Sequence, residues 1–458
     1  MARRVVLSSL DDLTTIAYRQ RILNDCMVQT QVVREIYDLA VEALVGEKEI
    51  WRFGRYPDAV LRRSVKALHL FIGILKRLRR IADERAGDFQ SGGLVAFFQL
   101  LTRELSDDYF HVVEEHLRQL RFRNGVLLSA ELGKGSKGID YLLRGPDMAR
   151  PGWLERLGLT EHSAYTLRIH ERDVAGATAL AELRDRGINS AANALAQAAD
   201  HILGFFAMLR WELGFYVGCL NLQARLAAKG EPVCLPVPVP SGQPTLSVQG
   251  LYDVCLSLRI DARAVGNHVD AQNASLVMIT GANQGGKSTF LRSVGVARLM
   301  MQCGMFVPAD SLAANLCNGL FTHYKREEDA EMDSGKLDEE LSRMSKIVDN
   351  VRRGSLVLFN ESFAATNERE GSEIARQVIR ALLDAGIDVF YVTHLFDLAD
   401  STYREYADET LFLRAERQDG GRRTFRLVEG APLPTSYGRD VYENIFEDGT
   451  SNRTSAQG

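Results

Sequence analysis

The stretch that decides the fold is Gly281-Ala282-Asn283-Gln284-Gly285-Gly286-Lys287-Ser288-Thr289. It fits the phosphate-loop pattern G-x4-G-K-[ST], follows an apolar run at 276–279, and precedes an expected helix, Phe290–Met301. Glycines let successive backbone N–H groups point at phosphate oxygens, and the helix N-terminus adds unsatisfied donors. A chance glycine-rich turn is the competing interpretation, which the strand before and the helix after disfavour. We therefore predict that all nine residues contact ATP.

Within this loop two side chains have predicted chemical roles. Lys287 is expected to reach the β- and γ-phosphates as a catalytic residue, and Ser288 to ligate Mg2+. The apolar run Leu356–Phe359 then ends in Asn360 and Glu361. We predict that Asn360 helps to hold Mg2+ and that Glu361 deprotonates the attacking water. A carboxylate that merely caps a turn is the alternative for Glu361.

A third candidate is His394, which closes the apolar run Asp388–Thr393. Ligands of open parallel sheets bind outside the carboxyl ends of the strands. A histidine at such an end can sense the γ-phosphate or hold the attacking water, so we predict a catalytic role. A histidine with a purely structural role is the competing interpretation.

The second half of the chain alternates short β-branched runs with amphipathic segments, which predicts a largely parallel sheet flanked by helices. The expected strands are Ser275–Thr280, Ser355–Phe359, Asp388–Thr393 and Thr410–Leu413. Between the phosphate loop and Asn360, the acidic stretch His323–Arg343 is expected to form a mobile loop that turns away from its own site, followed by a helix, Leu337–Val351. A plain solvated loop is the alternative. The predicted fold class is an α/β P-loop NTPase preceded by an all-α domain.

The first half of the chain has the pattern of helices. In Leu61–Ile81, apolar residues recur every three or four positions. Glycines at 133, 135 and 138 predict an exposed turn or hairpin, and a second helical block is expected over 178–229. Five prolines lie between Pro232 and Pro244 and exclude helix there. We predict a mostly helical domain at 1–235, an ATPase domain at 245–446 and a disordered tail at 447–458.

Composition and charge limit the other classes of protein. The chain is 46% hydrophobic and 25% charged, which is typical of a soluble globular protein. The N-terminus has no signal-peptide pattern, and Ile202–Leu222 contains Arg210 and Glu212, so we expect a buried helix and no membrane span. Residues 51–100 hold ten basic and four acidic residues, which permits contact with a polyanion or a solvated helix face. A cytoplasmic location is expected, because six cysteines lack any CxxC pair: Cys26, Cys219, Cys234, Cys255, Cys303 and Cys317.

Four ordered blocks of the second half resemble the MutS family of DNA mismatch-repair ATPases. They are the phosphate-loop run 281–309, the acidic motif 356–371 with Thr366 and Gly371, the strand–histidine segment 390–399, and 427–443 with its Ser-Tyr-Gly. Asn267 matches an asparagine upstream of the loop, and the helical first half resembles the core and lever region more loosely. The resemblance implies an ABC-like ATPase domain acting as a homodimer on DNA, with Ser334 and Gly335 of one subunit approaching the γ-phosphate in the other.

Several positions depart from the family pattern. Asn360 replaces an aspartate, Phe363-Ala364-Ala365 replaces Gly-Arg-Gly, and no Phe-x-Glu of a mismatch-reading domain occurs in residues 1–235. The leading hypothesis is an ATPase that hydrolyses Mg-ATP in a dimer and couples this to DNA binding in mismatch repair or recognition of a related DNA structure. The basic stretch 51–85 and Lys134–Lys137 are the predicted DNA contacts. The alternatives are an ATP-dependent dimerising scaffold of the same fold, and a protein that binds ATP without hydrolysing it.

Overall fold

The structure, a computed structural model, describes residues 2–8, 10–50, 54, 56–122, 125–144, 168–170, 172–242, 244–325, 335–406, 409–418 and 423–433. The chain forms two compact units, one of residues 1–27 with 218–458 and one of residues 28–217. We call the first the ATP unit, after the nucleotide site predicted from its sequence, and the second the helical unit. The sequence-based division at residues 235 and 245 stays a prediction. Both the predicted tail 447–458 and Ser334 lie outside the described residues.

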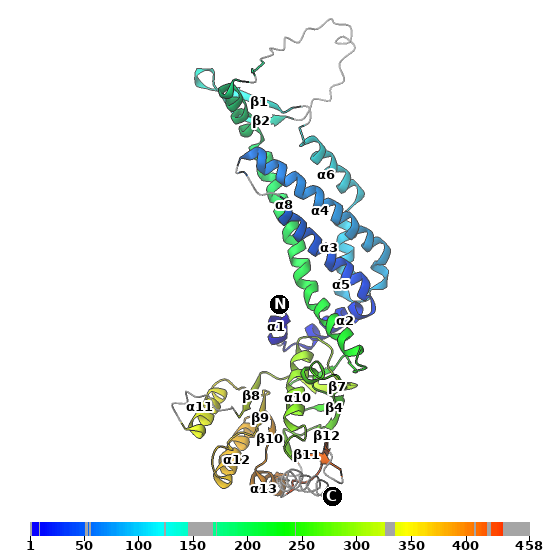
Figure 1. Cartoon of the computed structure of the whole chain (residues 1–458), viewed down its shortest axis with the longest axis vertical. Helices are drawn as coiled ribbons and strands as arrows, with labels where there is room; N and C mark the ends of the chain where they lie inside the picture. Colours follow the sequence, from blue (N-terminus) through cyan, green and yellow to red (C-terminus); the bar gives the residue numbers. More distant parts are fainter. Residues whose placement is uncertain are drawn as a thin grey trace, which may run out of the picture. The chain divides into compact units, whose positions relative to one another are not determined.

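The helical unit is built around one long amphipathic helix, α4 (Figure 1). Its apolar face is buried and includes Leu68, Phe71 and Leu75, which confirms the three-and-four spacing read from the sequence. The ring of Phe71 lies 5.9 Å from that of Phe206 on α8. Among the described residues, the helices of this unit include α3 (Thr30–Glu49), α4 (Pro57–Arg85), η1 (Ala86–Asp88), α5 (Gly92–Glu104), α6 (Asp107–Gln119) and the first part of α8 (Val174–Ala227).

A hairpin interrupts the helical pattern, so the prediction of an all-α region is wrong in this detail. Strands β1 (Leu127–Leu132) and β2 (Gly138–Arg144) pair antiparallel around η2 (Lys134–Ser136). The turn needs Gly135 because its φ of 71° lies in the left-handed region. The hairpin predicted around these glycines is confirmed.

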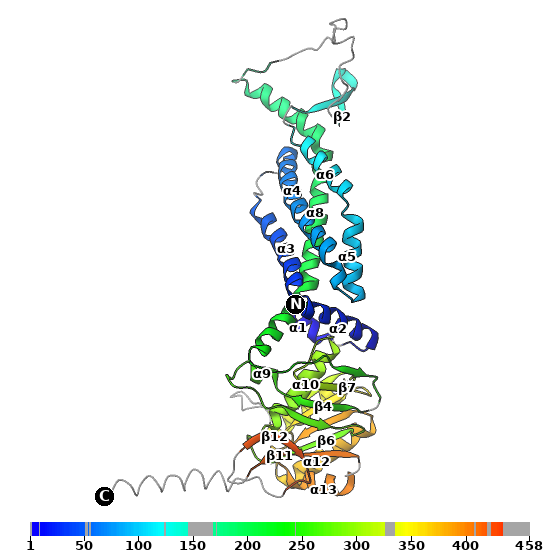
Figure 2. The ribbon, with the colours of Figure 1, turned by 90° about the vertical axis from the view of Figure 1, so that its right-hand side faces the viewer.

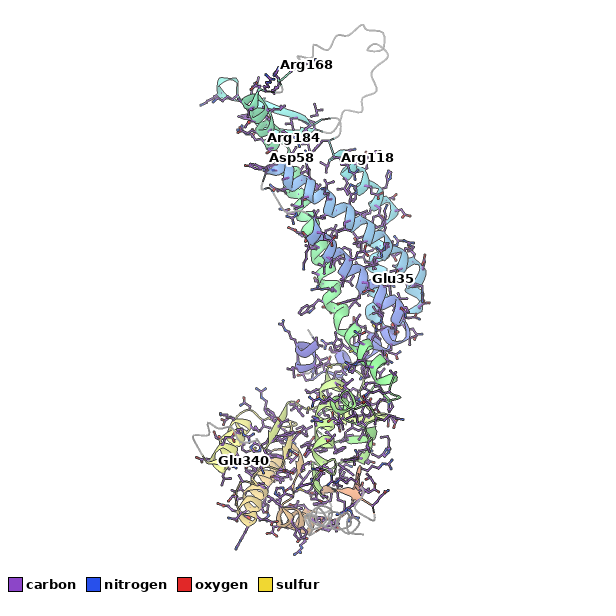
Figure 3. All side chains as sticks on the ribbon, in the orientation of Figure 1. Glu35, Asp58, Arg118, Arg168, Arg184 and Glu340 are labelled. Carbon is purple, nitrogen blue, oxygen red and sulfur yellow. The ribbon has the colours of Figure 1, made fainter. Side chains whose placement is uncertain are left out.

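Most cations of the basic stretch are paired with carboxylates of the same unit. Lys76 lies 2.6 Å from Glu114, and Arg77 lies 2.8 Å from Glu42. Asp58 accepts from both Arg62 and Arg184, and Figure 3 shows Asp58 and Arg184 side by side. The local excess of positive charge is therefore largely neutralised by acids elsewhere in the unit.

Helix α8 contains the apolar stretch 202–222 predicted to be helical. By length and composition alone it could cross a membrane, a test that core helices of soluble proteins also pass. A third of its most apolar window is buried within the protein.

The ATP unit contains a six-stranded sheet in the order β12-β11-β6-β10-β9-β8. Strands β11, β6, β10, β9 and β8 run parallel, and only β12 is antiparallel. The predicted parallel sheet is thus confirmed. Its strands are β6 (Leu276–Thr280), β8 (Leu320–Tyr324), β9 (Leu356–Asn360), β10 (Asp388–Val392), β11 (Thr410–Arg417) and β12 (Arg423–Glu429).

Helices cover both faces of this sheet. On one face α11 (Lys336–Val348), α12 (Glu368–Asp384) and α13 (Phe396–Tyr406) bury apolar side chains against β9 and β10. Figure 1 shows these helices beside the sheet. On the other face lies α10 (Lys287–Gln302), between this sheet and a second, four-stranded sheet (Figure 2). The second sheet has the order β3 (Val237–Val239), β7 (Ser311–Asn315), β4 (Leu246–Leu251) and β5 (Asn267–Asp270). The short α9 (Val254–Ser257) follows β4.

One prediction for this unit is wrong at its start. The expected loop His323–Arg343 begins inside strand β8, where His323 is fully buried. The acidic residues that suggested a loop lie further along, in 326–334, outside the described residues.

The N-terminal segment packs on the end of α10. The backbone of Leu10 donates to Gln302 O and accepts from Gln302 Nε2, both at 3.1 Å. The same amide group also bonds Cys317, and Gln302 is 1% exposed. Helices α1 (Ala2–Leu7) and α2 (Leu13–Val28) flank this contact.

Candidate nucleotide-binding site

The predicted phosphate loop connects the buried central strand β6 to α10. Gly281 has a φ of 112°, and a Cβ there would lie 2.8 Å from the backbone nitrogen of Ala415, so only glycine fits. Gly286 caps the helix with a φ of 94° and without a side-chain bond. The first turn of α10 carries no acidic residue. The positive end of the helix therefore stays available to an anion.

Lys287 is buried within this loop. Its ammonium donates to the carbonyl oxygens of Gly281 at 2.7 Å and Ala282 at 3.0 Å. Burial lowers the pKa of Lys287, and the nearby Glu361 carboxylate opposes that shift. A desolvated ammonium interacts more strongly with an anion than a hydrated one does. The loop thus holds its one cation, Lys287, against its own backbone carbonyl oxygens at the N-terminal end of α10.

The two predicted Mg2+ ligands lie in contact. The hydroxyl of Ser288, in the first turn of α10, donates to Asn360 Oδ1 at the end of β9, with 2.6 Å between the oxygens. These positions are 72 residues apart in the chain. Hydroxyl and amide oxygens are hard donors that suit Mg2+, which takes its remaining ligands from phosphates and water. No cluster of three or more His, Cys, Asp or Glu side chains that could hold a metal occurs among the residues with described placement.

Glu361 follows directly after β9, beside Lys287. Its backbone φ is 54°, and its N–H donates to Val392 O of β10 at 2.9 Å. Asn360 and Val392 are partners in the parallel register. Glu361 therefore leaves the sheet at the same edge as the phosphate loop, because the carboxyl ends of parallel strands share one edge.

His394 lies at this same edge, two residues after β10 ends. The preceding Thr393 is fixed by a bond from its N–H to Ile279 O of β6, at 3.0 Å. The side chain of His394 is exposed, and no hydrogen bond to a protein group defines its direction among the described residues. Its role in catalysis stays a prediction, as does that of Ser334.

A cavity of about 510 Å3 adjoins the loop. No pattern in the sequence predicted this cavity. Its walls come from the segment after β4, the first turns of α10 and strand β12, and they include Ile260, Val265, Gln284, Thr289 and Phe425. The amide of Asn267 accepts from Leu427 N at 2.7 Å and so joins β5 to β12 behind it. The cavity is mainly apolar and next to the phosphate loop, as a nucleotide base requires.

Comparison with known proteins covers both halves of the chain. Residues 11–229 match the family model of the MutS2 N-terminal domain, and residues 277–447 match MutS domain V, a P-loop ATPase domain. The DNA mismatch repair protein MutS of Thermus thermophilus is 30% identical over 168 residues, 37% of this chain. That of Desulforamulus reducens is 29% identical over 195 residues, 39% of this chain. The mouse MutS protein homolog 4 is 25% identical over 207 residues, 43% of this chain.

The chain belongs to the MutS family. The matched part covers 20%, 22% and 22% of the lengths of these three relatives, respectively. The resemblance read from the four sequence blocks is thereby confirmed at the level of the family.

Proposed function

We propose that this protein binds Mg-ATP at the phosphate loop, hydrolyses it as a dimer, and couples this to binding of DNA. The observation that carries the proposal is the convergence of Lys287, Ser288, Asn360 and Glu361 from two distant segments at one sheet edge. Phosphate-loop ATPases need this set: a cation for the β- and γ-phosphates, an oxygen pair for Mg2+, and a base.

Different groups of the protein have different roles in hydrolysis. The N–H groups of the loop and Lys287 bind the phosphates, with the base of the nucleotide in the adjoining cavity. Glu361 accepts a proton from water as the water oxygen bonds to the γ-phosphorus. The bond from that phosphorus to the bridging oxygen breaks, and its electron pair leaves on ADP. When bound, Mg2+ supplies positive charge that neutralises the phosphate oxygens.

Asn360 predicts slow hydrolysis. Its amide oxygen can accept from a Mg2+-bound water but carries no negative charge, unlike an aspartate. A protein that binds ATP without turnover is the corresponding alternative.

The proposed hydrolysis, with Glu361 as the base, is tested by measuring steady-state rates for the wild type and for Glu361→Ala. A general base contributes roughly 100- to 10,000-fold, so the variant should lose at least about 100-fold in kcat while still binding ATP. Sedimentation should show an ATP-bound dimer accumulating in this variant. Absence of hydrolysis in the wild type, with ATP bound, would favour the protein that only binds ATP.

The second candidate is a scaffold that uses ATP to dimerise and does not bind DNA. The ion pairs of Lys76 and Arg77 favour it, because they occupy cations that a DNA site would use. Mobility-shift assays with duplex, mismatched and branched DNA at several salt concentrations separate the two. The affinity of a DNA site should fall steeply as the salt concentration rises. If no DNA causes a mobility shift, the result supports the scaffold that does not bind DNA.

A further inference from the structure

The loop after Glu361 has a strained backbone. Glu361 and Phe363 have φ angles of 54° and 61°, a region that residues with a Cβ rarely adopt. Phe363 stands where the family resemblance puts a glycine, which would adopt this angle without strain. Such a conformation persists only where its surroundings determine it.

Three side chains from other elements hold this loop. Glu340 of α11 accepts from the backbone N–H of Phe363, with 2.7 Å between Oε2 and the nitrogen. His323 of β8 lies 2.7 Å from the hydroxyl of Ser362 through Nδ1, and its ring stacks on Phe363 at 5.3 Å between centroids. Tyr391 of β10 adds a bond from its hydroxyl to Ser362 O, at 2.9 Å. Three elements therefore fix the two residues that follow the base.

Burial makes this arrangement costly. Glu340 is 4% exposed and His323 is 0% exposed. Burial raises the pKa of Glu340, and the bond from Phe363 N opposes that shift. Burial also lowers the pKa of His323. His323 Nε2 lies 3.0 Å from the backbone carbonyl oxygen of Glu340, so His323 also contacts α11 at the residue whose side chain holds Phe363. A hydrophobic side chain in place of Glu340 would avoid the cost of desolvation, and it could not hold the N–H of Phe363.

We propose that Glu340 and His323 are positioning residues for Glu361: they hold Ser362 and Phe363, and through them aim the carboxylate of the base. Helix α11, where Figure 3 labels Glu340, is thereby connected to the chemistry without touching the nucleotide. This inference rests on the proposed function, in which Glu361 is the base. A misplacement of about 1 Å in a catalytic group can cost roughly 100-fold in rate.

Glu340→Ala and Glu340→Gln test the inference in the full chain. Glu340→Ala should lower kcat about tenfold or more while the Kd for ATP changes less than about twofold, because the phosphate loop is untouched. Glu340→Gln keeps an acceptor oxygen for Phe363 N and should retain kcat to within about threefold. Glu47→Ala serves as the control, because it removes a buried glutamate of the helical unit; its kcat should equal that of the wild type.

A double-mutant cycle separates positioning from a general loss of packing. In the Glu361→Ala background, Glu340→Ala should cause no further loss of single-turnover rate, since the group that it aims is gone. Gly371→Ala reaches the same loop from α12, because a Cβ there would lie 2.3 Å from Phe363 O. It should also lower kcat, and it provides the test if Glu340→Ala does not fold.

Three results would overturn the inference while leaving the proposed function intact. They are an unchanged kcat in Glu340→Ala, an equal loss in the Glu361→Ala background, and a parallel loss of ATP affinity. A wild-type protein without hydrolysis would overturn the proposed function and this inference together.

Discussion

The two units differ in how deeply their charged side chains are buried. In the ATP unit, Lys287, Arg298 and Asp253 are each less than 5% exposed, and each has a defined set of partners. In the helical unit, with Glu47 as an exception, cations such as Lys76 and Arg77 lie at the surface and pair with exposed acids. Desolvated charges are stable only with dedicated partners or a ligand, whereas exposed pairs contribute little. The contrast indicates chemistry in one unit and exchangeable surface contacts in the other.

The largest effect is expected from the buried charge of the phosphate loop. Lys287→Ala should weaken ATP binding by about 100-fold or more, because truncating a charged hydrogen-bond partner costs about 2–5 kcal/mol. The free energy of unfolding of the nucleotide-free protein should not fall, since the substitution removes the desolvated ammonium of Lys287. Fluorescent-nucleotide titration and thermal unfolding measure both quantities. Lys346→Ala, an exposed lysine of α11, is the matched control, and ATP affinity equal in the two variants would contradict the assignment.

A smaller effect is expected where the helical unit has cations without acidic partners. Lys66 and Arg80 are exposed and form no ion pair with the described residues. Replacing both with alanine should weaken DNA binding about tenfold and reduce the salt dependence by roughly one counterion for each residue. Fluorescence anisotropy over a salt series measures both. Lys76→Ala, which breaks an existing ion pair, should weaken DNA binding less. A greater loss of DNA affinity in Lys76→Ala would show that the paired cations, and not the unpaired ones, contact DNA.

Asn360→Asp should change Mg2+ affinity more modestly. A carboxylate added at the end of β9, where Asn360 is partly exposed, interacts with the divalent cation by about 1–2 kcal/mol, so the Mg2+ concentration for half-maximal hydrolysis should fall about fivefold. Titrating Mg2+ at saturating ATP gives this value. Asn360→Ala, which removes the oxygen, should shift it in the opposite direction, and an Asp variant that needs more Mg2+ would exclude Asn360 from the metal site.

The smallest effect is expected from an exposed ion pair. Arg77→Ala should lower the free energy of unfolding by about 0.2–1 kcal/mol, because both side chains of the pair with Glu42 are nearly half exposed. Chemical denaturation of Arg77→Ala, Glu42→Ala and the double variant gives the coupling between them. A coupling above about 2 kcal/mol would show that this pair resembles the buried charges of the ATP unit.

Local patterns in the sequence predicted four strands of the parallel sheet, because each of the four is a short apolar run with a polar residue at its end. The hairpin at Gly133–Gly138 was predicted from its glycines, and the lack of helix in the described residues of 232–244 was predicted from the prolines. The Ser288–Asn360 contact followed from the rule that strand ends share an edge. The roles proposed for Glu361 and His394 remain predictions.

Other features depend on contacts that no local pattern encodes. His323 adjoins an acidic stretch and so suggested a loop, yet it is buried by Ser362 and Phe363, about 40 residues further on. The acids that pair with Lys76 and Arg77 come from α6 and α3. The cavity beside the phosphate loop is lined by three separate segments of the chain. The positive φ of Phe363 could not be predicted either, because phenylalanine rarely adopts such an angle.

The contact of Leu10 with Gln302 has a practical consequence for dissecting this protein. A fragment cut at residue 245 would remove the backbone that bonds the side-chain amide of Gln302 and would expose apolar surface beneath α1 and α2. Residues 1–27 belong to the same compact unit as the phosphate loop. An ATPase fragment intended for biochemistry should therefore join this N-terminal segment to residues 218–458 through a short linker in place of the helical unit.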